Sequence, residues 1–139
     1  MKRLLLLALI CLMGFYACKK DADGSKKIIG KWIRTKSLRL KNINGIDSLV
    51  EEKNGLGAND YTQFNTDGTG HTTFGIPEVN DVNFTYQIEK DALFIRIIGG
   101  DNAPFKIKTL TSNSLVLRIQ LETTQIPGIV YYREDYYTK

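Results

Sequence analysis

The chain has 139 residues, a formal net charge of +4 at pH 7, 42% hydrophobic and 24% charged residues, and two cysteines. This length suits one domain with a single hydrophobic core and leaves no room for a second. The positive charge is modest and scattered along the sequence, so the composition argues against nucleic acid as a partner.

The first 17 residues have the pattern of a secretory signal peptide. Two basic residues follow the first methionine, and an apolar run covers Leu4–Phe15. This run is shorter than the about 20 residues that span a bilayer. Ala17 directly precedes Cys18, which resembles the lipobox of bacterial lipoproteins, with Phe15 in place of the usual leucine. The resemblance implies that the chain is cut before Cys18, that the cysteine is lipidated, and that the membrane is a partner through this N-terminal anchor.

Residues 18–27 are predicted to be the lipidated N-terminus and a flexible tether. Lys19–Lys27 is polar and charged and has too few apolar side chains to pack. Its charges loosely resemble the surface-export address of some Gram-negative lipoproteins, and a plain solvated linker explains them equally well. Cys11 lies in the signal segment, so Cys18 would be the one thiol of the mature chain. An ordinary residue of a signal peptide that is cut elsewhere is the alternative for Cys18.

From residue 28 onward the sequence shows strand periodicity. The clearest case is residues 82–88, where Val82, Phe84, Tyr86 and Ile88 alternate with polar residues. We expect about nine strand segments, and they lie near residues 32–42, 46–53, 60–65, 69–75, 82–89, 93–97, 105–108, 115–121 and 128–137.

Short polar turns between these segments predict a meander of antiparallel strands. An open meander exposes unpaired backbone groups on its two edge strands, and closing the sheet removes them. We therefore expect an all-β domain over residues 28–139, an antiparallel up-and-down β-barrel of about eight strands. A two-layer sandwich is the main competing architecture. The interior of such a barrel is either filled by side chains or holds one small ligand.

A Gly-x-Trp sequence, from Gly30 to Trp32, opens the first strand, and Arg133 lies in the last. With the lipobox, the charged linker, the hairpin at residues 64–69 and the segment at 110–117, these features resemble the lipocalin-like domain lipoproteins of Gram-negative bacteria. The resemblance implies a barrel at the outer membrane, on its periplasmic or its surface side. It also implies that Gly30 and Trp32 close one end of the barrel, with the guanidinium of Arg133 across the indole.

The inward positions of the predicted barrel are nearly all apolar, which favours a small hydrophobic or amphipathic ligand. The residues expected to line its site are Phe84, Tyr86, Ile95, Phe105 and Leu117. The hydroxyl of Tyr86 is the polar group expected to orient the ligand. The alternative is a surface or periplasmic protein-interaction module that uses the barrel as a scaffold without a cavity and whose partner the sequence does not identify.

No sequence pattern predicts catalysis, a cofactor or a metal site, so we expect a protein that is not an enzyme. His71 is the one histidine, and no nucleophile motif surrounds it. Glu51 and Glu52 are adjacent on a predicted strand and face opposite ways, so they cannot share a substrate as acid and base. The tyrosine-rich segment 131–137 fits either a carbohydrate or aromatic ligand or, more simply, a sheet with one row of rings in the core.

Overall fold

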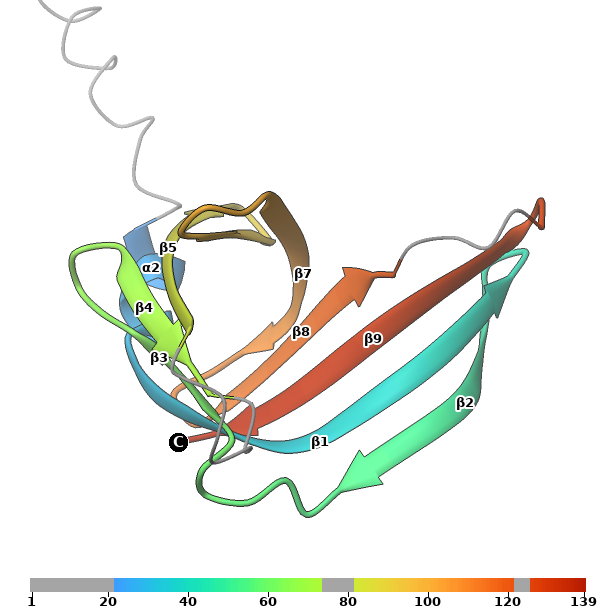
Figure 1. Cartoon of the computed structure of the whole chain (residues 1–139), viewed down its shortest axis with the longest axis horizontal. Coiled ribbons are helices and arrows are strands. Elements are labelled where there is room, and N and C mark those ends of the chain that lie inside the picture. The colour runs from blue at the N-terminus through green and yellow to red at the C-terminus, as the bar shows by residue number, and fades with distance from the viewer. Residues whose placement is uncertain (1–21, 74–81, 122–125) are drawn as a thin grey trace, which may run out of the picture.

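The computed structural model describes residues 22–73, 82–121 and 126–139. They form one short helix and nine antiparallel strands (Figure 1). The elements are α2 (Ala22–Ile28), β1 (Gly30–Ile43), β2 (Ile46–Asn54), β3 (Tyr61–Phe64), β4 (Thr69–Thr72), β5 (Val82–Glu89), β6 (Ala92–Ile97), β7 (Asn102–Leu110), β8 (Ser114–Gln120) and β9 (Ile129–Thr138). The predicted all-β class and order of strands are confirmed, although part of the segment predicted at 69–75 lies outside the described residues.

Strand β1 closes the barrel because its two edges have different partners. Residues 30–33 pair with β3, and residues 33–43 pair with β9 along the opposite edge. From β3 to β9, each strand pairs with the next in sequence. The strands β1 and β3–β9 therefore form a closed eight-stranded barrel, which excludes the two-layer sandwich.

Strand β2 lies outside this barrel. It pairs with residues 36–43 of β1, on the edge that β3 leaves free, while residues 129–136 of β9 pair with the other edge. We call these three segments the extension; it runs to the right in Figure 1. Asn44 and Gly45 turn the chain between β1 and β2 with φ of 52° and 87°, as an Asn-Gly hairpin requires. All nine residues of β2 are exposed.

Helix α2 occupies part of the tract that the sequence predicted to be a flexible tether. Its last residue, Ile28, is fully buried in the core cluster. The indole Nε1 of Trp32 donates a hydrogen bond to the Ile28 carbonyl over 2.6 Å. This side chain, this bond and a bond from the Lys139 ammonium to the Lys27 carbonyl over 3.3 Å dock a helix that is otherwise polar, and the composition of residues 19–27 did not reveal it. The prediction of a flexible linker up to residue 27 is wrong for this part.

A contiguous apolar cluster fills the barrel near α2. Its buried members are Ile28, Trp32, Phe64, Phe84, Leu93, Leu115, Leu117 and Tyr137. The rings of Phe64, Phe84 and Tyr86 meet edge to face, with centroids 5.0–6.4 Å apart. Phe84 also packs directly on the backbone of β4, since a Cβ on Gly70 would overlap its ring and the carbonyl oxygen of Gln63. Side chains thus occupy the space between these strands.

Candidate functional site

The five residues predicted to line a ligand belong to this packed interior. Phe84 and Leu117 are only 2% and 3% exposed, and Tyr86, Ile95 and Phe105 pack against the same cluster. Of four cavities that described residues line, Phe84, Ile95 and Leu117 border none, Tyr86 borders two and Phe105 borders one. These side chains stabilise the barrel by filling it.

The hydroxyl of Tyr86 is already bonded within the protein. It donates to the carbonyl of Asn65 over 2.6 Å. Burial, and secondly the charge of Asp67, raise the pKa of this phenol, so it stays protonated as a donor at neutral pH. Tyr86 therefore holds the turn between β3 and β4 and is not free to orient a ligand.

Trp32 lies in the core beside α2, and the cation over its ring is Lys139. The Lys139 ammonium lies 4.6 Å from the centre of the Trp32 ring and donates to the carbonyl of Ile29 over 2.9 Å. Gly30 has a φ of 120°, which residues with a side chain rarely adopt, and its Cβ position lies 3.4 Å from Lys139 Cε, an ordinary contact distance. Lys139 thus holds the C-terminus against the start of β1.

The expectation that Arg133 covers Trp32 is wrong. Arg133 lies opposite Arg39 in the sheet. That position is seven residues beyond Trp32 on β1, or about 23 Å along a strand. The Arg133 Nε instead donates to Asp135 over 2.9 Å. The resemblance placed an arginine correctly in the last strand, but the register of β9 on β1 assigns it to the far end of the barrel.

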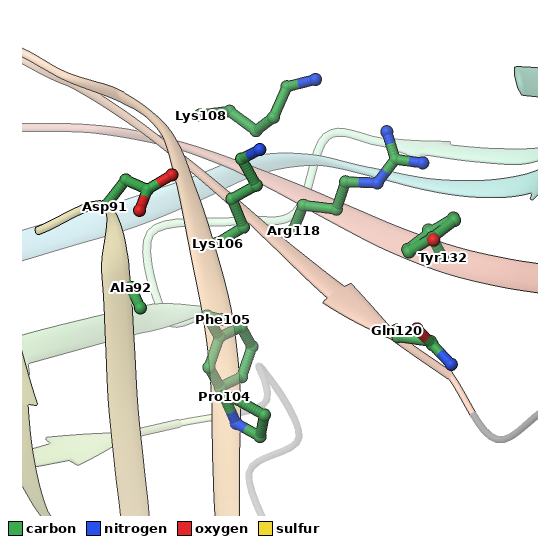
Figure 2. A pocket seen from close by; sticks show the side chains of 9 residues that line it. All are labelled: Asp91, Ala92, Pro104, Phe105, Lys106, Lys108, Arg118, Gln120 and Tyr132. Carbon is green, nitrogen blue, oxygen red and sulfur yellow. The ribbon is translucent and has the colours of Figure 1, made fainter. Parts of the chain in front are cut away.

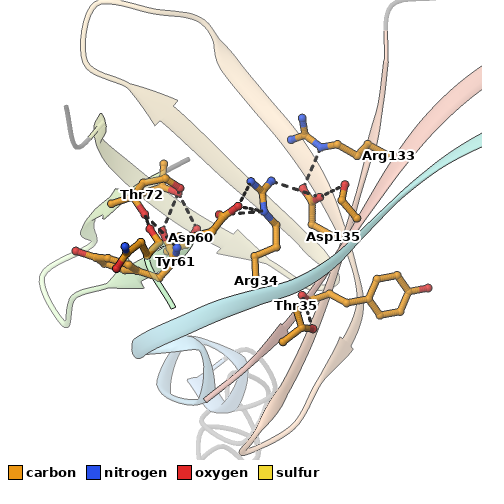
Figure 3. A network of polar contacts seen from close by, with 12 residues as sticks. Arg34, Thr35, Asp60, Tyr61, Thr72, Arg133 and Asp135 are labelled. Carbon is orange, nitrogen blue, oxygen red and sulfur yellow. Dashed lines mark hydrogen bonds and ion pairs between the residues drawn. The ribbon is translucent and has the colours of Figure 1, made fainter. Parts of the chain in front are cut away.

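A buried polar network joins β1, β9 and the residue before β3 (Figure 3). Arg34 donates to both carboxylate oxygens of Asp60 over 2.7–3.2 Å and lies 3.6 Å from Asp135. Asp135 also accepts hydrogen bonds from Ser37 and Arg133. The carboxylates of Asp60 and Asp135 are only 4% and 1% exposed. Each is paired and hydrogen-bonded, as buried charges must be, so this network is structural.

The sequence did not lead us to predict this network, although the position of Arg34 gave one indication of it. Arg34 follows Trp32 by two residues, so it faces the same side of the strand. The register shift between Arg34 and Lys36 then brings Ser37 to the inner face. A bulge of this kind cannot be read from alternation, because it changes which residues face inward.

The largest described cavity is a groove on the outer surface, between β6–β7 and β8–β9 (Figure 2). Its volume is about 540 Å³, and it is lined by Asp91, Ala92, Pro104, Phe105, Lys106, Lys108, Arg118, Gln120 and Tyr132. We call it the outer groove. The register shift between Ile107 and Thr109 bends β7 against β8 at this point. Strand alternation gives no sign of this bend, so the sequence did not reveal the groove.

Arg118 forms the charged wall of the outer groove. Its guanidinium lies 3.8 Å from the centre of the Tyr132 ring and donates to both carboxylate oxygens of Asp47, from β2, over 2.7 and 2.9 Å. A third bond goes to Glu134 over 3.1 Å. The hydrogen bonds from Arg118 and Asn42 lower the pKa of Asp47 to about 2. This arginine is therefore fixed and largely neutralised.

The two lysines of the outer groove differ in their partners. Lys108 lies 3.7 Å from Glu134. Among the described residues, no ion pair or hydrogen bond involves the side-chain ammonium of Lys106. The outer groove thus offers one uncompensated ammonium beside the apolar surfaces of Pro104 and Tyr132.

The described residues contain no group of three or more histidine, cysteine, aspartate or glutamate side chains arranged to hold a metal ion. His71 packs against the ring of Tyr61, with centroids 5.5 Å apart. In the part of the chain that the structure describes, no helix is long and apolar enough to cross a membrane.

Comparison with known proteins identifies the family. A family model for the lipocalin-like domain matches residues 28–117. The chain belongs to the lipocalin-like domain family. A crystal structure of a lipocalin-like protein from Bacteroides uniformis is 16% identical and covers 81% of this chain and 98% of its own, with a TM-score of 0.44. No curated protein matches the sequence. In this lipocalin-like chain, the family match ends in β8, and β9 completes the closed wall.

Proposed function

We propose that this lipocalin-like protein is a lipoprotein of the Gram-negative cell envelope, anchored through Cys18, that binds a small amphipathic molecule with an anionic head group. The proposed site is the outer groove and not the barrel interior, which the sequence had favoured. One observation carries the proposal: an unpaired ammonium, on Lys106, borders a concave surface to which Pro104 and Tyr132 contribute apolar area.

The contacts of the outer groove suit a carboxylate or phosphate attached to an apolar body. Lys106 can donate to the head group without giving up an ion pair inside the protein. A guanidinium has five N–H donors, and the bonds of Arg118 to Asp47 and Glu134 involve Nη1 and Nη2, which leaves Nε for a ligand. Apolar surface then gives the affinity, and the charged donors give the orientation.

A fluorescent fatty-acid analogue and its methyl ester test the site, because they differ only in the anionic head. The acid should bind more tightly than the ester, and Lys106→Ala should weaken binding of the acid about tenfold, the effect of losing one hydrogen bond to a charged group. Lys31→Ala is the matched control, since Lys31 is an exposed lysine of β1 outside the outer groove. Equal binding of acid and ester, or equal effects of the two variants, would reject the site and favour a scaffold that acts through a protein partner.

The anchor has a separate test. Cys18 lies outside the described residues, and α2 begins four residues later. Cells given an alkyne-labelled fatty acid should incorporate the label into the wild-type protein and not into Cys18→Ser. Label that persists in the variant would contradict anchoring at this cysteine.

A further inference from the structure

The far end of the extension carries exposed isoleucines. Ile43 pairs directly with Ile46 on one side and with Ile129 on the other, so the three side chains point to the same face. Ile126 lies beside them, since the Ile129 amide donates to its carbonyl over 3.3 Å. Ile46 and Ile126 are 72% and 58% exposed. We call these four residues the isoleucine tip; contiguous exposed apolar groups of this kind mark a contact surface.

A band of cations lies behind the isoleucine tip on the same face. Lys41 and Arg39 precede Ile43 by two and four residues, and alternation puts all three on one side of β1. The Arg39 guanidinium lies 5.4 Å from the centre of the Tyr131 ring. No carboxylate of the described residues is in ion-pair distance of Arg39 or Lys41. Glu51, opposite Arg39, pairs with Lys53 over 3.4 Å.

The isoleucine tip and the N-terminal end of α2 lie toward the same, upper edge of the molecule in Figure 1. Cys18 precedes α2 by only four residues. Four residues reach at most about 14 Å, so a membrane that holds the chain at this cysteine would lie near the N-terminal end of α2.

We propose that the isoleucine tip is a second membrane contact, in which the isoleucines enter the boundary between head groups and acyl chains of an anionic lipid surface and Arg39 and Lys41 lie at the phosphates. This inference rests on the proposed anchor at Cys18. Uncompensated cations beside an apolar edge match an anionic interface. The same cations would repel each other if two copies of the chain met tip to tip.

A tryptophan placed in the isoleucine tip reports the contact. In Ile46→Trp, lipids brominated in the acyl chain should quench the new indole on vesicles that contain phosphatidylglycerol. The native Trp32 is fully buried and gives a constant background. The matched control is Ala58→Trp, which puts an exposed indole in the loop after β2, at the opposite edge in Figure 1. Adding Lys41→Ala to Ile46→Trp should lower the ratio of membrane-bound to unbound isoleucine tips about fivefold relative to Ile46→Trp alone. Adding Lys31→Ala instead should leave this ratio unchanged.

Two results would overturn the proposal. One is equal quenching of the Ile46→Trp and Ala58→Trp variants on vesicles that hold the protein. The other is a change in Ile46→Trp emission that depends on protein concentration without vesicles, which would assign the isoleucine tip to a second copy of the chain. The mass of the mature protein shows independently whether Cys18 carries lipid. If Cys18 carries no lipid, the same quenching is measured with the vesicles in excess. The isoleucine tip can therefore be tested even if the proposed anchor is wrong.

Discussion

Gly70→Ala is the substitution that most sharply tests whether side chains fill the barrel. Gly70 lies opposite Phe64 and Phe84 in the sheet. Its new Cβ would overlap the ring of Phe84 and the carbonyl of Gln63, and the carbonyl belongs to a paired strand and cannot move away. Overpacking of a filled core costs about 3 kcal/mol. The smaller entropy of the unfolded alanine chain offsets about 0.5–1 kcal/mol of this.

The free energy of unfolding should therefore fall by about 2 kcal/mol, measured by urea denaturation, with a melting temperature lower by about 6–10 °C. Gly57→Ala is the control, because no atom lies within 4 Å of the Cβ position at Gly57 and its φ is not in the left-handed region. Adding Phe84→Leu should restore part of the stability lost in Gly70→Ala. If Gly70→Ala is as stable as Gly57→Ala, the ring of Phe84 has empty space to move into, and the claim of a filled interior fails.

Two further predictions concern the ends of the sheet. Lys139→Ala should lower the free energy of unfolding by about 1–2 kcal/mol and shift the fluorescence emission of the single tryptophan, Trp32. Arg133→Ala should leave this emission unchanged. Equal emission shifts in the two variants would contradict Lys139 as the cation over Trp32. The Asp47 carboxyl should titrate at about pH 2 by NMR because Arg118 and Asn42 donate to it. Since its folded-state pKa lies below the ordinary 3.8, its stabilising effect is complete at neutral pH and is lost as the pH falls toward about 2. In Arg118→Gln, the pKa of Asp47 should rise toward its ordinary value of 3.8. An unchanged pKa would show that the hydrogen bonds from Arg118 do not cause the shift.

Most of the barrel wall could be predicted from the sequence because each strand has one buried and one wet face. Residues 82–88 show this plainly, since Phe84 is buried and both Asn83 and Thr85 are exposed. The same rule could not place β2, which is exposed on both faces. Among the described residues, β2 is held by its backbone pairing with β1 and by the hydrogen bonds that Asp47 accepts from Arg118 and Asn42, and these leave no periodic signal.

The candidate site was harder to predict because it depends on register. The outer groove lies where the register shift in β7 bends that strand against β8, and alternation gives no sign of such a shift. The identity of the cation over Trp32 depends on where the last strand ends. Strand β9 ends at Thr138, so Lys139, and not Arg133, lies beside the indole. One buried residue, Ile28, docks a helix in a tract whose composition predicts a tether.

The barrel interior is packed, and we propose that ligand binding occurs on the outside. Chemical-shift mapping by NMR tests it most directly, with the fatty-acid analogue titrated into the isotope-labelled mature protein. We expect shifts at Lys106, Arg118 and Tyr132, which line the outer groove, and none at the buried Phe84 and Leu117. Shifts that centre on Phe84 and Leu117 and leave Lys106 unchanged would contradict the account and return the ligand to the barrel.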